Sequence, residues 1–289
     1  MSNMPHSVAQ RLLNFSKTHN EEYNFVLARY GVERLLYRLS RSTSGSRFVL
    51  KGASLFLVWF GHAFRTTRDV DLLGMGASDL EAIARLFREL CEPDTEAVDG
   101  LVFQKETVKA NRIKEDQDYQ GVRVLLRTML GKSRIDLQVD IGFGDAITPD
   151  PERINFPTLL DGPPPTLLAY PPYTAIAEKF HAMVLLDQAN SRMKDFYDIC
   201  VMFRSFSLDA GILVQAIQRT FARRDLALPV MIPTALTPAF SDDPLKQAQW
   251  NAFIHKSRLT VTLRDLPSVV NELRGHLLPT FQLLDIKIK

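Results

Sequence analysis

The stretch KGASLFLVWFGHAFRTTRDVDLLG, residues 51–74, decides the fold. A short apolar strand ends at Gly52, an apolar helix follows over residues 53–60, and a second strand carries Asp69 and Asp71. Residues two apart in a strand point to the same face, so the two aspartates should lie side by side. Neighbouring carboxylates repel each other unless a cation lies between them, and Mg2+ prefers a few carboxylates together with substrate phosphates. The spacing therefore predicts a divalent metal site.

The glycine before the helix predicts a place for phosphate. Gly52 and Ala53 are small enough to let the backbone approach a phosphate group. Ser54 opens the helix that follows, and helix N-termini favour anions. We therefore expect residues 51–54 to seat phosphates beside the two aspartates.

Four separated stretches carry a family resemblance. Residues 51–54 (KGAS) and 65–71 (RTTRDVD) resemble the signature of the AbiEii/MenT toxin family of bacterial nucleotidyltransferases. Residues 177–182 (AEKFHA) and 192–199 (RMKDFYDI) are similar to the two downstream motifs of that family. Family members often carry Gly-Gly after the lysine, where this chain has Gly52-Ala53. The four stretches occur in the family's order.

The resemblance implies roles for individual residues. Lys179 contacts a nucleotide phosphate, and Asp198, together with Asp195, holds Lys179 or positions the accepting hydroxyl. The two aspartates are three residues apart, so they share one face of a helix. His181 is expected to be structural. By the same resemblance, the nucleotide is bound by Lys51, Gly52, Ser54, Thr67, Arg68 and Lys179.

A third metal-binding carboxylate is expected from a neighbouring strand. Residues 134–142 (RIDLQVDIG) place Asp136 and Asp140 on one face of such a strand. The family has its third acidic residue late in this strand, so Asp140 is preferred as a metal ligand beside Asp69 and Asp71. Asp136 stays the alternative, because a shift in register reverses the choice.

Hydroxyl and guanidinium groups flank the aspartate pair. Related toxins carry Ser or Thr two residues upstream of the pair, where this chain has Thr67. Thr67 either binds phosphate, is itself modified, or caps the strand. Arg65 and Arg68 either neutralise phosphate or are solvated.

The family implies a toxin of a toxin–antitoxin pair that uses Mg2+ and NTP. Two metal ions would hold the triphosphate and activate the attacking hydroxyl. In some members the acceptor is the 3′ end of tRNA, which blocks translation. Two alternatives stay open: transfer to a small molecule or a protein hydroxyl, and a non-catalytic module that binds an antitoxin. Candidate phosphate contacts for a nucleic-acid acceptor are Lys105, Lys109, Arg112, Lys114, Arg123, Arg127, Lys132, Arg219, Arg223 and Arg224.

Bulk properties indicate an ordinary globular protein. The chain has 289 residues, of which 46% are hydrophobic and 24% charged, with a net charge of +2. That balance does not by itself predict a nucleic-acid binder. Cys91 and Cys200 are isolated, and the longest apolar run, residues 55–60, is far shorter than the roughly 20 residues of a membrane helix. We therefore expect a soluble, cytoplasmic protein with no membrane partner.

A proline-rich stretch over residues 149–172 predicts a domain boundary near residue 165. We expect residues 1–165 to form a nucleotidyltransferase domain of the α/β (α+β) class, with a mixed β-sheet flanked by helices. Residues 166–289 should form a helical domain that completes the active site. Periodicity and turn residues predict strands over 47–50, 66–73, 101–109, 121–130 and 134–142, and helices over 5–19, 21–41, 53–60, 78–90, 173–188, 192–205, 208–224, 243–257 and 265–276.

Overall fold

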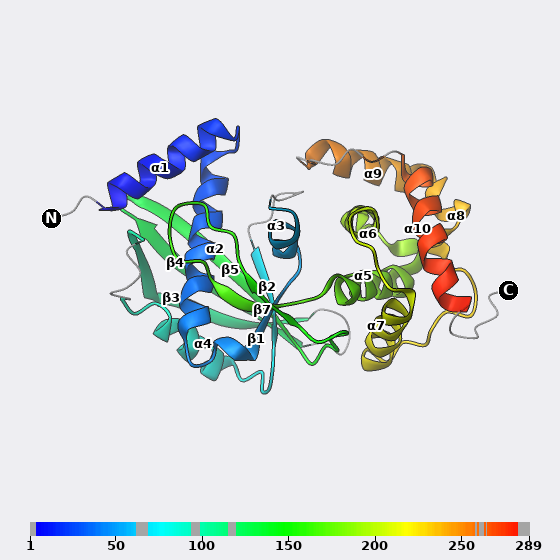
Figure 1. Ribbon diagram of the computed structural model, residues 1–289, viewed down its shortest axis with the longest axis horizontal. Coiled ribbons are helices and arrows are strands. Elements are labelled where there is room, and N and C mark those ends of the chain that lie inside the picture. The colour runs from blue at the N-terminus through cyan, green and yellow to red at the C-terminus, as the bar shows by residue number, and fades with distance from the viewer. Residues whose placement is uncertain are drawn as a thin grey trace. The chain divides into compact units, whose positions relative to one another are not determined.

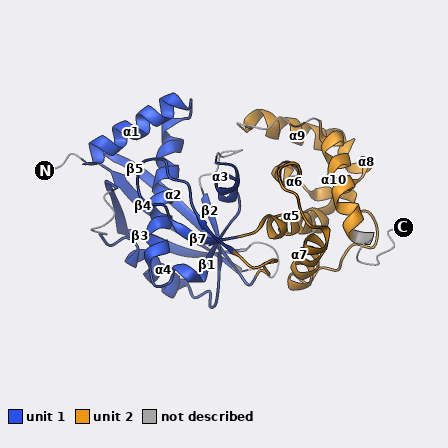
Figure 2. Cartoon of the chain, viewed as in Figure 1, with its two compact units in different colours: residues 1–144, 152–169 blue, residues 145–151, 170–289 orange. Residues whose placement is uncertain are grey.

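The computed structural model describes residues 4–61, 69–93, 99–114, 120–257, 259, 263 and 265–282. The chain forms two compact units, which we describe separately (Figure 2). Unit 1 comprises residues 1–144 and 152–169, and unit 2 comprises residues 145–151 and 170–289. The assignment of the nucleotidyltransferase site to residues 1–165 and of its completion to residues 166–289 stays a prediction.

Unit 1 is built from a sheet with helices around it (Figure 1). Its elements in chain order are α1 (Met4–Thr18), α2 (Tyr23–Arg41), η1 (Gly45–Arg47), β1 (Phe48–Lys51), α3 (Ser54–Phe60), β2 (Asp69–Gly74), α4 (Leu80–Glu89), β3 (Leu101–Lys114), β4 (Gln120–Leu130), β5 (Ser133–Phe143), β6 (Glu152–Asn155) and β7 (Thr166–Ala169).

Within the described residues, seven strands form one mixed sheet in the order β3-β4-β5-β2-β1-β7-β6. β3, β4 and β5 pair antiparallel, whereas β5 runs parallel to β2, and β1 runs parallel to β7. Helix α2 packs against the face of β5 that carries the buried Ile135 and Leu137. Alternate residues of a strand point to opposite faces, so the other face of β5 carries its polar side chains.

Unit 2 is helical. Its elements are α5 (Pro172–Leu186), η2 (Asp187–Ala189), α6 (Met193–Ser205), α7 (Ala210–Arg223), η3 (Thr234–Leu236), α8 (Pro238–Ser241), α9 (Pro244–Lys256) and α10 (Leu266–Gln282).

The segment 145–151 is tied to the helices of unit 2. Arg224 donates to Asp145 over 2.9 Å, and the backbone N–H of Thr148 donates to the Thr174 hydroxyl over 2.8 Å. Among the helices that the structure describes, none combines the length and the apolar character needed to cross a bilayer.

The expected mixed α/β fold is confirmed, and the helices lie where periodicity placed them. Two strands were missed, β6 and β7, because they lie inside the stretch whose prolines indicated irregular structure. Each is only four residues long, and β7 gains its partner from β1, far away in the sequence. Of the strand expected over residues 66–73, residues 66–68 lie outside the described residues.

His181 of α5 is part of the core of unit 2. Its ring packs edge-on against Phe221 with the centroids 5.1 Å apart, and within the described part of the chain neither ring nitrogen has a hydrogen-bond partner. Burial, with a smaller effect of the Arg224 charge, lowers the pKa of His181 to about 4. A neutral, packed imidazole fits the structural role expected for this residue.

We expect His181 to make unit 2 less stable in mild acid. Because its folded pKa lies below the unfolded value near 6.5, its contribution to stability is full above pH 6.5 and is lost as the pH falls toward 4. The loss should reach roughly 2 kcal/mol by pH 5, and His181→Leu should remove it. Denaturant unfolding at pH 7.5 and 5, followed by Trp250 fluorescence in a Trp59→Phe background, measures the difference.

The matched control for that measurement is His255→Leu, at an exposed position of α9. It should leave the pH dependence of the parent protein in place. An unchanged acid loss in His181→Leu would show that the buried imidazole is not its source.

Candidate functional site

Four charged residues lie in one row across four neighbouring strands of unit 1. The pairing of β1 with β2 sets Lys51 opposite Asp71, that of β2 with β5 sets Asp71 beside Asp140, and that of β5 with β4 sets Asp140 opposite Arg123. Register partners share a face of the sheet, and adjacent strands are about 4.8 Å apart. We call these four residues the charged row. Its signs run plus, minus, minus, plus, on the face opposite α2.

Gly52 and Asp71 are in close contact at the bend after β1. Gly52 has φ +73°, and a Cβ atom built on it would overlap the Oδ2 atom of Asp71. Any residue with a Cβ atom at this position would therefore displace the Asp71 carboxylate. We expected a phosphate group to approach Gly52 closely. In the structure the group close to Gly52 is the Asp71 carboxylate, and phosphate binding there stays a prediction.

Asp69 and Asp71 occupy β2 as the spacing predicted. Val70 between them is 1% exposed and points into the core, so both aspartates lie on the other face. Asp69 is exposed at the start of the strand, beside Gln138 of β5. Ser54 is buried as the first residue of α3.

Asp140 is held by a two-pronged ion pair. The Nε and Nη2 atoms of Arg123 donate to its two carboxylate oxygens over 2.8 and 2.7 Å. The side-chain amide of Gln138 lies 3.2 and 3.3 Å from the same oxygens. Both oxygens of this carboxylate are therefore engaged by side chains of β4 and β5.

The register separates Asp140 from the alternative, Asp136. Asp140 is the partner of Asp71, whereas the described residues of β2, from Asp69 onward, include no partner of Asp136. Asp136 is exposed and pairs with Arg127 over 2.9 Å and with Arg134 over 3.0 Å. The hydrogen bond from Arg127 lowers the pKa of Asp136. Asp140 is thus the carboxylate of β5 that neighbours the aspartates of β2.

The donor set fits a divalent ion beside the two aspartates of β2. Mg2+ in phosphate-binding sites is held by one or two carboxylates, with substrate oxygens and water completing the shell. Asp69 and Asp71 supply that number next to the Gly52 bend. In the part of the chain that the structure describes, no group of three or more His, Cys, Asp or Glu is arranged around a common metal position. Both oxygens of Asp140 accept hydrogen bonds from Arg123.

Lys179 in unit 2 is held between two carboxylates. Its Nζ atom donates to Asp195 over 2.9 Å and to Asp198 over 2.8 Å. The aspartates lie on α6, three residues apart as the helical spacing predicted, and their side chains are only 6% and 0% exposed. Breaking a buried ion pair leaves an uncompensated charge, which costs several kcal/mol. The lysine is therefore fixed in place.

Some of the expected site residues cannot be placed or are already engaged. Arg65, Thr66, Thr67 and Arg68 lie outside the described residues. Several basic residues proposed for a nucleic-acid acceptor bind side chains of the protein itself: Lys105 binds Glu92, Arg112 binds Ser78, Arg123 binds Asp140, Arg127 binds Asp136 and Arg224 binds Asp145.

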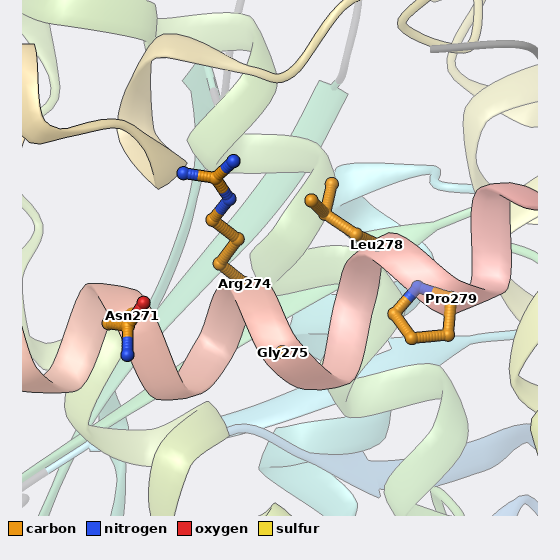
Figure 3. A pocket seen from close by; sticks show the side chains of 5 residues that line it. All are labelled: Asn271, Arg274, Gly275, Leu278 and Pro279. Carbon is orange, nitrogen blue, oxygen red and sulfur yellow. The ribbon is translucent and has the colours of Figure 1, made fainter.

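A hollow of about 350 Å³ on unit 2 contains none of the expected site residues (Figure 3). All of its lining residues belong to α10, and Arg274 is the charged residue among them. One helix surface does not enclose a ligand, so the hollow receives no role. The lining residues are Asn271, Arg274, Gly275, Leu278 and Pro279.

Sequence reasoning missed that Arg123 faces Asp140. The signal was the hairpin between β4 and β5, whose loop is Gly131 and Lys132, with Gly131 at φ +57°. A two-residue loop pairs Leu130 with Ser133 and so sets Arg123 opposite Asp140. The predicted strands end at residue 130 and begin again at residue 134, and this three-residue loop shifts the register by one residue.

Comparison with known proteins adds a family match. The family model described as "Nucleotidyl transferase AbiEii toxin, Type IV TA system" matches residues 34–272. No curated protein sequence matches the chain at a significant level. Among solved structures, JHP933 from Helicobacter pylori is 15% identical, with 87% of this chain and 89% of that chain covered and a TM-score of 0.49. A candidate nucleotidyltransferase from H. pylori is 16% identical, with 87% and 92% covered and a TM-score of 0.46.

We expect Gly52→Ala to destabilise unit 1 more than Gly61→Ala does. Both glycines have a left-handed φ, at +73° and +74°, which costs a residue with a Cβ about 1–2 kcal/mol. A Cβ at Gly61 meets nothing within 4 Å, whereas one at Gly52 overlaps the Asp71 carboxylate. That overlap should cost about 1–3 kcal/mol more. Urea unfolding followed by Trp59 fluorescence measures the free energy of unfolding of both variants.

Gly61→Ala is the control for the backbone conformation alone. Equal destabilisation of the two variants would show that the carboxylate does not press against the bend.

Proposed function

Because the chain belongs to the AbiEii family of nucleotidyl transferase toxins of type IV toxin–antitoxin systems, we propose that it transfers a nucleoside monophosphate from NTP to an acceptor hydroxyl. The observation that carries this proposal is the charged row of Lys51, Asp71, Asp140 and Arg123 beside the Gly52 bend. It places paired carboxylates and cations on one face of one sheet. The acceptor oxygen attacks the α-phosphorus, and pyrophosphate leaves.

Asp69 and Asp71 would hold Mg2+, and Asp140 would be the third carboxylate. The bound ion supplies positive charge to the triphosphate and to the leaving pyrophosphate. The contact between Asp71 and Gly52 fixes one of these carboxylates before substrate arrives. Lys51, Gly52 and Ser54 seat the triphosphate, and we keep Thr67 and Arg68 as further nucleotide contacts.

Lys179 contributes a positive charge to the reaction from unit 2. Two carboxylates orient its ammonium group, and the Lys179 side chain as a whole is 15% exposed. A lysine ammonium binds phosphate as a compact charge with three donors. Asp195 and Asp198 accept from this ammonium group and so fix its position.

The acceptor we propose is the 3′ end of tRNA, whose modification blocks aminoacylation and hence translation. These substrates place the chemistry in the cytoplasm, and the type IV family supplies a cognate antitoxin as the partner. Transfer to a small molecule or a protein hydroxyl is the second candidate acceptor. It is favoured by the net charge of +2 and by the pairing of Arg123, Arg127 and Arg224 within the protein.

The decisive test is incubation of the protein with each labelled NTP, Mg2+ and total tRNA, followed by mass spectrometry of the tRNA 3′ ends. We expect label on RNA with at least one NTP. Asp71→Asn and Lys179→Gln should each lower the rate by at least about 100-fold, because each removes charge that stabilises the transferring phosphoryl group.

Lys256→Gln, an exposed lysine at the end of α9, is the matched control for charge and should keep the parent rate. Label on a protein or a small molecule in place of RNA would select the second acceptor class. Absence of transfer to every acceptor, with growth inhibition undiminished in Asp71→Asn cells, would refute catalysis and favour a non-catalytic module.

A further inference from the structure

Arg123 occupies both oxygens of the carboxylate that the proposed site needs. Its guanidinium contacts Asp140 through two hydrogen bonds of 2.8 and 2.7 Å, and Asp140 is the register partner of Asp71. We propose that Arg123 is a latch on Asp140: it keeps this carboxylate out of the metal shell and competes with a divalent ion for it. This inference rests on the proposed function and assigns a positioning residue to it.

The exposure of the pair distinguishes a latch from a permanent structural tie. The Arg123 side chain is 39% exposed, whereas the Asp140 side chain is 13% exposed. The arginine therefore lies at the solvent side of the pair and can leave without opening the core. Lys179, in contrast, is 15% exposed and is bound to a fully buried Asp198, so that ion pair is permanent.

Electrostatics explains why the arginine and the ion exclude each other. Asp140 neighbours Asp71, so an ion bound by both would lie within a few ångströms of the Arg123 guanidinium. Two cations at that distance repel strongly in a half-buried setting. The two-pronged geometry also leaves neither carboxylate oxygen unoccupied, and Gln138 lies against both. A divalent ion and the guanidinium therefore compete for the negative charge of Asp140, and binding of the ion favours departure of Arg123.

The same two strands offer a matched control. Arg127 of β4 faces Asp136 of β5 in the same register, with its Nε atom 2.9 Å from the carboxylate. Among the described residues of β2, which begin at Asp69, none pairs with Asp136. The two pairs have the same residue types on the same strands, but Asp136 is more exposed than Asp140, at 56% against 13%, and also binds Arg134.

The test is calorimetric titration of the full chain with MnCl2, without nucleotide. Arg123→Gln should bind Mn2+ about tenfold more tightly than the parent, because the competing cation is gone. Arg123→Lys, which keeps the charge but loses the two-pronged contact, should gain about threefold. The gain of Arg123→Gln should vanish when Asp140→Asn is added, and Arg127→Gln should match the parent. Thermal unfolding checks that each variant is folded. If Arg123→Gln is not folded, the result for Arg123→Lys decides the question.

Two results would overturn the latch while leaving the proposed function intact. One is unchanged or weaker Mn2+ binding in both Arg123 variants, in a protein that still transfers nucleotides. The other is an equal gain in Arg127→Gln, which would reduce the effect to general surface charge. Failure of every variant to bind Mn2+, together with absence of nucleotide transfer, would refute the proposed function and this inference with it.

Discussion

Repulsion between two carboxylates is the constraint around which unit 1 is organised. Asp71 and Asp140 are register partners on adjacent parallel strands, a strand spacing apart on one face of the sheet. Two like charges at that distance are tolerated only where cations compensate them. The row supplies a cation at each end, Lys51 as the register partner of Asp71 and Arg123 bound to Asp140. Gly52 is required by the same arrangement, because any larger residue would displace the Asp71 carboxylate.

Local sequence patterns were enough to predict where Asp71 points and the bend beside it. The alternation of Asp69, Val70 and Asp71 could be read from the strand period, and the bend at Gly52 from the glycine itself. The parallel pairing of β2 with β5 could not be read, because a helix and two strands separate them in the chain. β6 and β7 were missed for a related reason. β6 pairs with β7, and β7 pairs with β1, and this pairing stabilises both strands despite the surrounding prolines. Long-range pairing leaves little trace in local composition.

The hairpin between β4 and β5 shows how finely such predictions depend on register. Both strands were expected, yet placing Ser133 in the loop would set Arg123 opposite Ile141 and remove the ion pair to Asp140. A slip of one residue sends every side chain of a strand to the other face. The choice between Asp136 and Asp140 likewise depended on a pairing that only the folded sheet supplies. In unit 2, by contrast, the helical spacing of Asp195 and Asp198 sufficed to put them on one face, and only their contact with Lys179 required the structure.

The two units deal with paired carboxylates in physically opposite ways. In unit 2 the two aspartates are buried and Lys179 binds them both. Moving the lysine away would leave uncompensated charges in a medium of low polarity. In unit 1 the pair lies on a sheet face where the Arg123 side chain is 39% exposed, so water reaches the guanidinium and the pair opens at a lower cost than the buried one. An ion pair that is cheap to open, placed where a doubly charged ion can take over its carboxylate, behaves as an exchangeable counterion. The ion pair of Arg127 with Asp136, farther along the same two strands, has no aspartate of β2 beside it among the described residues. The position of Asp140 beside Asp71, and not the ion pair by itself, is what gives Arg123 its part in the site.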